Sequence, residues 1–325
     1  MRNLLLVLTL ASLAFAQDAP EPPKPVEPEA QPVVKVDPWA VEKPESNPEG
    51  EPVDLKVSMD PKVVHDARAD ITQNMSVMGQ ATKIENVIGL KLQFKEDGDD
   101  SASFEMSVDL QKIAQNGMDQ TAMVKSMLSD PKFTGKFDKK GNVVPGSVTG
   151  SGLAALEAQL KAAVSWVLPF AGNRRVRKGE VWEVAPAEFA PRVQGATGGD
   201  VSGNVFMKLI GLEEKDGAKC AHVEIVFGLT IRNADIPTPM GPQKGTVRIK
   251  GTVRELCGLD GVLRSREVKS KLNVEVGGMT VQVDGDSKFE ASPAAPAAKE
   301  ATPEGCGCGD DGMDGCGCGE MGGGG

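Results

Sequence analysis

The stretch IGLKLQFKEDGDDSASFEMSVDL, from Ile88 to Leu110, decides the fold class of this chain. Apolar residues occupy alternate positions up to Phe94 and again from Phe104 onward, with mostly polar residues between them. This period of two is typical of antiparallel strands that bury one face. The segment 96–100 between the two runs is rich in Asp and Gly, which favour turns. The sequence therefore predicts a β-hairpin.

The same alternation continues through most of residues 53–290, which we expect to form the folded domain. Further strands are predicted near 55–59, 69–80, 133–138, 142–148, 180–185, 201–212, 219–232, 245–257, 261–276 and 279–289. Helical spacing of leucines predicts one helix from about Gly152 to Leu168, and a weaker one over 119–128. The predicted class is mainly β (α+β), with a curved antiparallel sheet or half-barrel packed around one or two helices.

The beginning of the chain has the layout of a secretory signal. Arg2 precedes an apolar run, and Ala14-Phe15-Ala16 forms a small-residue cleavage site, so we expect a signal peptide over residues 1–16. That run is too short to cross a bilayer comfortably, and we expect no transmembrane segment in the mature chain. The predicted location is therefore exported, which includes the periplasm, the cell surface and the extracellular space.

Three further segments differ from the domain in composition. Residues 17–52 are rich in Pro and charged residues, which predicts a disordered spacer in which Trp39 is a candidate for docking onto the domain or a partner. Residues 291–304 form an Ala/Pro linker. Residues 305–325 are almost entirely Gly, Cys and acidic residues, which predicts a disordered tail unless it is cross-linked or binds a metal.

The composition excludes several classes of function. A net charge of -10 is unfavourable for binding nucleic acid, which requires a surplus of Lys and Arg. The chain has no Tyr and two His, and the sequence brings no titratable groups together in a catalytic pattern. Cys220, His222 and Glu224 alternate along one strand, about 7 Å apart, which is too far for a nucleophile, base and orienting group. We therefore expect a protein that is not an enzyme and has no resident cofactor.

Two motifs carry a family resemblance. The run from Phe133 to Val143 contains the turn Asp138-Lys-Lys-Gly141, and Gly179-Glu180-Val181-Trp182 follows the expected helix. With these motifs, residues 53–290 resemble a family of exported bacterial proteins catalogued as domain of unknown function 6263. The resemblance implies an exported, strand-rich domain without an assigned activity, and it implies no catalytic residue.

The two cysteines of the domain are candidates for a disulfide, because exported proteins tend to oxidise their thiols. Apolar matching places Val223 opposite Val253, and this register puts Cys220 opposite Leu256 rather than Cys257. The thiols then lie on opposite faces, and a bridge requires a one-residue bulge. The alternatives are a disulfide that would add about 2–4 kcal/mol and two separate buried or reduced thiols.

The tail holds four more cysteines in two Cys-x-Cys pairs, Cys306/Cys308 and Cys316/Cys318. Four thiolates on a flexible Gly chain are suited to one soft ion such as Zn(II) or Cu(I), although the spacing is not that of a structural zinc site. Cross-linking to another chain and a tail with incidental thiols are the alternatives.

The remaining candidate residues have ordinary structural explanations. His65 and His222 are expected on the surface, since a lone His near charges needs no special role. Trp166 and Trp182 are expected as core aromatics, with stacking on a ligand as the alternative. The cluster formed by Arg174, Arg175, Arg177 and Lys178 is expected as a solvated loop, with an anionic lipid head group or an acidic partner as the alternative.

These observations predict an exported, non-enzymatic protein of the bacterial envelope. Its domain is expected to serve as a binding or structural module for another envelope protein, and its Cys-rich tail to supply cross-links or metal binding. The alternative is a carrier of a lipid or another apolar ligand, held in a cavity between the curved sheet and the helix. The many methionines would suit an adaptable pocket, although Met more often fills cores.

Overall fold

The computed structural model describes residues 37–77, 79–95, 101–127, 132–138, 143–144, 146–150, 166–193, 199–238 and 241–294. Its strands are β1 (Glu49–Leu55), β2 (Val64–Val77), β3 (Gln80–Lys95), β4 (Ser101–Gln115), β5 (Met118–Asp119), β6 (Lys132–Asp138), β7 (Thr149–Gly150), β8 (Arg174–Lys178), β9 (Val181–Glu183), β10 (Asp200–Lys215), β11 (Ala218–Thr238), β12 (Gly241–Gly258), β13 (Leu263–Val276) and β14 (Met279–Ala294). Its helices are α2 (Thr121–Met127) and α4 (Pro186–Val193).

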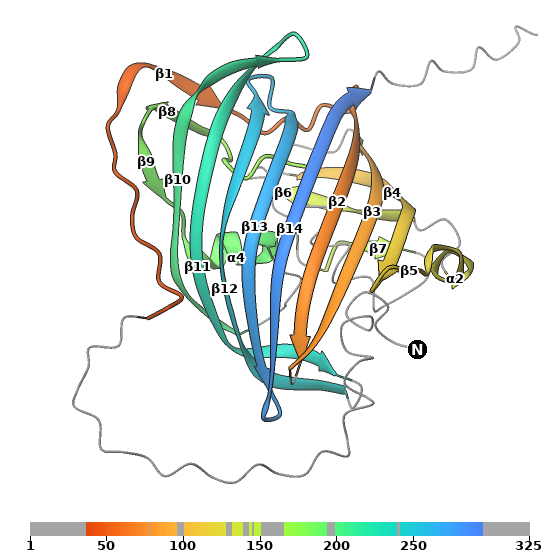
Figure 1. Cartoon of the computed structure of the whole chain (residues 1–325). Helices are drawn as coiled ribbons and strands as arrows, with labels where there is room; N and C mark the ends of the chain where they lie inside the picture. Colours follow the sequence, from red (N-terminus) through yellow and green to blue (C-terminus); the bar gives the residue numbers. More distant parts are fainter. Residues whose placement is uncertain are drawn as a thin grey trace, which may run out of the picture. The chain divides into compact units, whose positions relative to one another are not determined.

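One antiparallel sheet forms most of the domain (Figure 1). Its strand order is β7-β6-β4-β3-β2-β14-β13-β12-β11-β10-β9, with β5 on β4, while β1 and β8 pair separately. Most neighbours in the sheet are also neighbours in the chain, as expected for hairpins, and the last strand β14 returns to pair with β2. The sheet curves and does not close, so the predicted curved antiparallel sheet is confirmed. The predicted hairpin is also confirmed, because Phe94 of β3 stands opposite Phe104 of β4.

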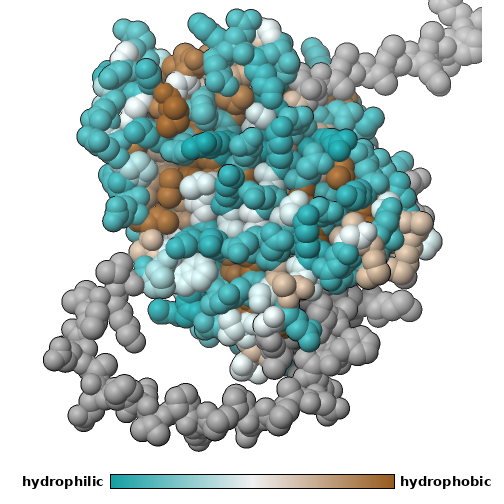
Figure 2. Space-filling model, viewed as in Figure 1, coloured by the Kyte–Doolittle hydropathy of each residue, from teal (hydrophilic) through white to brown (hydrophobic). Residues whose placement is uncertain are grey.

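Alternation of side chains gives the sheet two different faces. The outer face carries mostly charged and polar residues and is largely hydrophilic in Figure 2. The inner face carries two large hydrophobic clusters, one over β2–β4 and β6 and the other over β9–β12. Leu92 and Phe94 belong to the first cluster, and Val223 and Phe227 to the second. Burial of this face is the main stabilising contribution to the domain.

Short elements cover the inner face at its two ends. α4 packs on β11 through Phe189, whose ring centroid lies 5.3 Å from that of Phe227. The sequence did not predict α4, whereas the weak helix expected over 119–128 corresponds to α2. The helix predicted from Gly152 to Leu168 lies almost entirely in 151–165, outside the described residues.

Two predicted strands differ from the structure. The run expected near 55–59 belongs to β1 only at Leu55, because Val57 and Ser58 donate their N–H groups to the Asn173 side chain and the Gly261 carbonyl instead of a strand. The run expected at 142–148 makes a single bridge at Val143 before the short β7.

Residues 37–48, which we call the N-terminal strap, lie across the outer face within the predicted spacer. The Lys250 ammonium donates to the Pro38 carbonyl at 2.8 Å and lies 5.8 Å from the centre of the Trp39 ring. Lys250 stands opposite Gly228, where a Cβ would approach the Trp39 carbonyl oxygen to 2.1 Å. Trp39 therefore docks onto the domain, over a glycine that leaves room for its backbone.

The strap continues to the edge of the sheet. Lys208 of β10 donates to the Glu45 carbonyl at 2.8 Å, and the N–H of Val181 in β9 donates to the Ser46 hydroxyl at 3.1 Å. The Asn47 N–H donates to the Gly179 carbonyl at 3.0 Å, just before β1 begins. The strap thus covers the edge strand β9, which protects an exposed strand edge from pairing with other chains.

We expect Gly228→Val to release this strap. The new side chain would occupy the position of the Trp39 carbonyl, so the free energy of unfolding should fall by about 1–3 kcal/mol. Limited proteolysis should then cut within 37–48, which the wild type protects. The control Thr230→Val places the same side chain two residues further along the same face, and it should leave the cleavage rate unchanged. Equal protection in both variants would contradict the docked strap.

Candidate functional site

A row of small residues crosses the middle of the inner face. Phe227 marks that face, because α4 packs on it, and residues directly opposite one another in an antiparallel sheet point to the same side. Opposite Phe227 stands Gly251, and the row continues strand by strand through Ser270, Gly285 and Gln73. The central strands β12, β13, β14 and β2 thus place no large apolar side chain in this row.

Among the described residues, the row is recessed at Gly285. Beyond its chain neighbours, a Cβ at this position would have Ser270 Oγ, at 3.2 Å, as its only contact within 4 Å among the described residues. At Gly251, in contrast, the Phe227 ring would lie 2.9 Å away, so that the space above this glycine is filled. The backbone of Gly285 does not require a glycine, since its φ lies outside the left-handed region.

The rows on either side of Gly285 are mostly apolar, with Ser287 between Val268 and Ile71, and they are incompletely covered on β13 and β14. Val268 and Leu272 of β13 and Val283 of β14 face inward but are only half-buried. Together with Ser270, Gly285 and Gln73 they form what we call the central strip. By the strand register, neither the central row nor its two flanking rows carries a charged residue on β12, β13, β14, β2 or β3. The central strip is therefore a neutral surface between the two hydrophobic clusters.

A buried ion pair lies further along the same face. Glu255 of β12 stands opposite Arg266 of β13, and their side chains are 0% and 2% exposed. Arg266 donates from Nη2 and Nε to Glu255 Oε2, at 2.8 and 3.1 Å. Its remaining donors reach the carbonyls of Trp166 and Leu168, both at 2.7 Å. The charges are paired and hydrogen-bonded, which a charge pair in an apolar interior requires.

The ion pair fastens the segment 166–171 to the sheet. Glu255 accepts from the N–H groups of Phe170 and Ala171, at 3.2 and 2.9 Å. The Phe170 ring stacks on the Arg266 guanidinium, whose central carbon lies 3.5 Å from the ring centre. The sequence contains one sign of this site. Glu255 alternates with Val253 and Cys257, so that the strand pattern places a carboxylate on the inward face.

A second polar pair, His65 and Arg264, faces inward near one end of β2 and β13. The prediction of a surface His65 is wrong: the side chain is 1% exposed, and its ring meets the edge of Phe94 at 5.6 Å between centroids. In β2, His65 lies on the same inward face as Ala67 and Ala69. The charged Asp66 and Arg68, which alternate with these residues, made this pattern hard to recognise in the sequence. Burial and, to a smaller extent, the nearby Arg264 lower the pKa of His65 to about 4, against a smaller opposite effect of Asp260.

The two domain cysteines, Cys220 and Cys257, are free and buried in the structure. The predicted register is displaced by two residues: Ile225, not Val223, stands opposite Val253, and Cys257 stands opposite Ala221. A bulge between Ile231 and Ala234 shifts the register by one residue along these two strands. Burial raises the pKa of both thiols, most strongly for Cys257, where the Glu255 carboxylate adds to the effect.

The other predicted site residues are placed as follows. Trp182 is 4% exposed in the hydrophobic cluster over β9–β12, beneath Arg174, whose guanidinium carbon lies 5.6 Å from the ring centre. Trp166 is half-buried and contacts both hydrophobic clusters. His222 is half-buried opposite Leu256. Cys306, Cys308, Cys316 and Cys318 lie outside the described residues, and their metal or cross-linking role stays a prediction.

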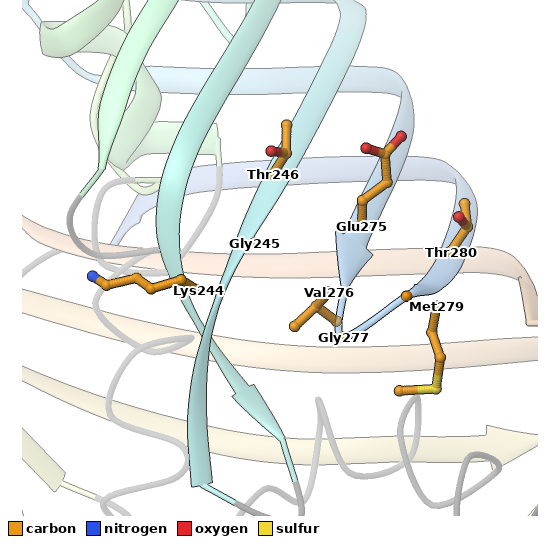
Figure 3. A pocket seen from close by; sticks show the side chains of 9 residues that line it. Lys244, Gly245, Thr246, Glu275, Val276, Gly277, Met279 and Thr280 are labelled. Atoms are coloured by element: carbon orange, nitrogen blue, oxygen red, sulfur yellow. The ribbon is translucent and has the colours of Figure 1, made fainter.

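An open groove of about 350 Å³ lies at the opposite end of β12–β14 (Figure 3). Its charged residues already have partners: Lys244 pairs with Asp235 at 2.7 Å, and Glu275 pairs with Arg248. Gly277 and Gly278 form its floor in the turn between β13 and β14. Because these charges neutralise one another, the central strip is the better candidate for a binding site.

Metal clusters and membrane-spanning helices are absent from the described parts of the chain. No group of three or more His, Cys, Asp or Glu residues there has a geometry suited to a metal ion. No helix in the same residues is both long and apolar enough to span a membrane.

Comparison with known proteins gives distant likenesses only. No model of a known protein family and no curated protein matches the chain. A structure of lipovitellin, described for its lipid–protein interactions, matches 75% of this chain and 27% of its own, at 9% identity and a TM-score of 0.38. This chain thus spans under a third of that protein.

Two bacterial structures match a larger share of their own length. A protein described as exported, with a YmcC-like fold, from Bacteroides fragilis is 11% identical, over 74% of this chain and 99% of its own, at a TM-score of 0.23. A DUF1329 family protein from Desulfovibrio piger is 9% identical, over 68% and 83%, at 0.14. Likenesses this distant carry no argument about function.

Proposed function

We propose that this protein is an exported, non-enzymatic binding protein that holds a hydrocarbon chain on the inner face of its sheet. The observation that supports this most directly is the recess at Gly285, where an inward Cβ would meet only Ser270 Oγ among the described residues. Together with the half-buried residues beside it, this position leaves a surface among the described residues that is suited to a ligand rather than to core packing.

The chemistry of the central strip favours an apolar ligand. Val268, Leu272 and Val283 offer half-buried apolar surface, and the adjoining rows carry no charge. Covering such surface contributes about 25 cal/mol per Å² of area removed from water. The hydroxyl of Ser270 and the amide of Gln73 are small neutral groups that permit close approach. A linear hydrocarbon chain is therefore the class of ligand that this surface fits best.

The reactive groups of the domain support a role without catalysis. Cys220 and Cys257 have pKa values raised by burial, so neither is the thiolate that nucleophilic attack requires. His65 has no hydrogen-bond partner among the described residues, and its lowered pKa keeps it neutral. No base is therefore held against a nucleophile here.

Export is supported by the sequence alone. The basic, apolar and small-residue order of residues 1–16 matches a cleaved signal peptide. A carrier of apolar molecules has an obvious use outside the cytoplasm, because such molecules do not cross an aqueous compartment unaided. We place the protein in the periplasm, at the cell surface or outside the cell.

Filling the recess should abolish binding. We expect Gly285→Leu to weaken uptake of the fluorescent apolar probe N-phenyl-1-naphthylamine at least about tenfold, because the new side chain occupies the place of the ligand. The matched control is Asp284→Leu, which puts the same side chain on the exposed outer face one residue away. Fluorescence titration measures both affinities, and circular dichroism verifies that both variants fold.

Three results would oppose this proposal. They are a wild type that takes up no probe, a folded Gly285→Leu variant that binds as tightly as the wild type, and an equal loss of binding in both variants. The last result would place the probe elsewhere on the molecule.

A further inference from the structure

The open groove beside the β13–β14 turn contains a row of three polar side chains. Glu275 of β13 stands directly opposite Thr246 of β12 on one side and Thr280 of β14 on the other. Residues opposite one another in antiparallel strands point to the same face, and Figure 3 shows these three side chains on one side of their strands. The row therefore spans three adjacent strands, with about 5 Å between one strand and the next.

The carboxylate at the centre of the row is held in place, and one of its oxygens stays free. Arg248 Nη1 and Asn273 Nδ2 both donate to Glu275 Oε1, the latter at 3.2 Å. Glu275 Oε2 has no hydrogen-bond partner among the described residues, and the hydroxyls of Thr246 and Thr280 have none there either. The row thus presents a fixed acceptor between two groups that can each donate and accept.

The groove around this row has room for a small molecule. Its volume of about 350 Å³ lies within the range of small-molecule sites. In its floor, Gly278 has a φ of 80°, and no described atom beyond its chain neighbours lies within 4 Å of the place of a Cβ there. A ligand can therefore approach the backbone of the turn as well as the row of side chains.

The charges at the groove select against ionic ligands. Lys244 pairs with Asp235 at 2.7 Å and Arg248 pairs with Glu275, so neither cation is left to hold an anion. A metal ion such as Ca²⁺ takes six to eight oxygen ligands, whereas the lining supplies one carboxylate, which already pairs with an arginine. The hydrogen-bonding groups that remain free suit an uncharged molecule with several hydroxyl groups.

We propose that this groove binds an uncharged sugar residue through Thr246, Glu275 and Thr280. Glu275 Oε2 accepts from hydroxyl groups of the sugar, and the two threonine hydroxyls bond to its other oxygens. A hydroxyl that donates to a carboxylate makes a charge-assisted hydrogen bond, which is roughly twice as strong as a neutral one. The row lies on the outer face of the sheet, so this inference is independent of the hydrocarbon site on the inner face.

The test titrates three uncharged sugars, the methyl glycosides of glucose, galactose and N-acetylglucosamine, into the full-length protein, followed by saturation-transfer difference NMR. At least one should bind, in the millimolar range that a small and open site allows. Thr246→Val and Thr280→Val replace a hydroxyl by a methyl group of similar size, and each should weaken that binding at least about fivefold. The matched control Thr252→Val makes the same change six residues further along the same face of β12, and it should leave the affinity unchanged.

A charged sugar tests the class of ligand. Glucuronate should bind more weakly than the uncharged glycosides, because its carboxylate would face Glu275 without a free cation. Glu275→Gln should weaken the uncharged sugar at least about tenfold, since it removes the charge-assisted hydrogen bonds. Uptake of N-phenyl-1-naphthylamine should stay the same in Thr246→Val and Thr280→Val, which leave the inner face untouched.

Three results would overturn the sugar site and leave the proposed function standing. The first is a wild type that binds none of the three glycosides. The second is glucuronate binding more tightly than all of them. The third is sugar affinity that is the same in the wild type, Thr246→Val and Thr280→Val, with circular dichroism showing that both variants fold.

Discussion

Replacing Glu255 by Gln should lower the free energy of unfolding by about 3–5 kcal/mol, the usual cost of leaving one buried charge unpaired. Arg266 would keep its positive charge at 2% exposure without a counterion. The new amide would also turn an N–H₂ group toward donors, because Phe170, Ala171 and Arg266 all donate to the Glu255 oxygens. Urea denaturation followed by circular dichroism measures the loss.

An exposed pair provides the control for this prediction. Lys271 and Asp284 lie 3.7 Å apart with side chains 66% and 65% exposed, so Asp284→Asn should change stability by less than about 1 kcal/mol. The double variant Glu255→Leu with Arg266→Met should retain more stability than Glu255→Gln, because it removes both charges together. A Glu255→Gln variant as stable as the Asp284→Asn control would show that the pair is not buried in solution.

The function of the ion pair follows from what it holds. Arg266 and Glu255 bond to four backbone groups of the segment 166–171, and Trp166 in that segment contacts both hydrophobic clusters. The pair therefore joins the two halves of the core at one end of the central strip. We expect its loss to loosen the inner face as well as to reduce stability, since a half-satisfied polar network is worse than an apolar one.

Alternation along each strand predicted most of the sheet, because the period of two is a property of neighbouring residues. The buried positions of Met106 and Val108 could therefore be predicted without knowing which distant residues they contact. The same rule applied to β2 would have placed His65 inside, had the predicted strand begun at residue 64 rather than 69. The predicted β11–β12 register is displaced by two residues, because registers two residues apart match the same apolar faces of both strands.

The candidate site could not be predicted in the same way. The pairing of Glu255 with Arg266 depends on the β12–β13 register, and the bonds of the pair to 166–171 join residues 84 to 100 positions apart. The recess at Gly285 depends on which of the described side chains reach that glycine, and a sequence does not display this. The sequence indicated the strap over Gly228 only at Trp39. The other contacts of the strap join its backbone carbonyls to lysines of the sheet, and any exposed segment could make such contacts.

Stability should fall between pH 6.5 and pH 5 because of His65. Its pKa in the folded protein is about 4, because burial and Arg264 disfavour the charged form, an effect that Asp260 only partly opposes. In the unfolded chain His65 takes up a proton near pH 6.5, so below that pH the unfolded state binds more protons and gains stability. The stabilisation is complete above pH 6.5 and is lost progressively down to pH 4, by about 3 kcal/mol in total and about 2 kcal/mol by pH 5. Urea midpoints at a series of pH values measure this slope.

The pH window separates His65 from the carboxylates. Glu85, Asp119 and Glu290 also have lowered pKa values, but the stability they contribute is lost only as the pH falls below about 5, since unfolded carboxylates titrate near pH 4. His65→Leu should abolish the slope between pH 6.5 and 5 and retain stability at neutral pH, because leucine fills the site beside Phe94 without unpaired nitrogens. Glu85→Gln should leave the slope between pH 6.5 and 5 intact, because the pKa of Glu85 is lowered from its ordinary value. A slope that survives in His65→Leu would mean that a group other than His65 causes it.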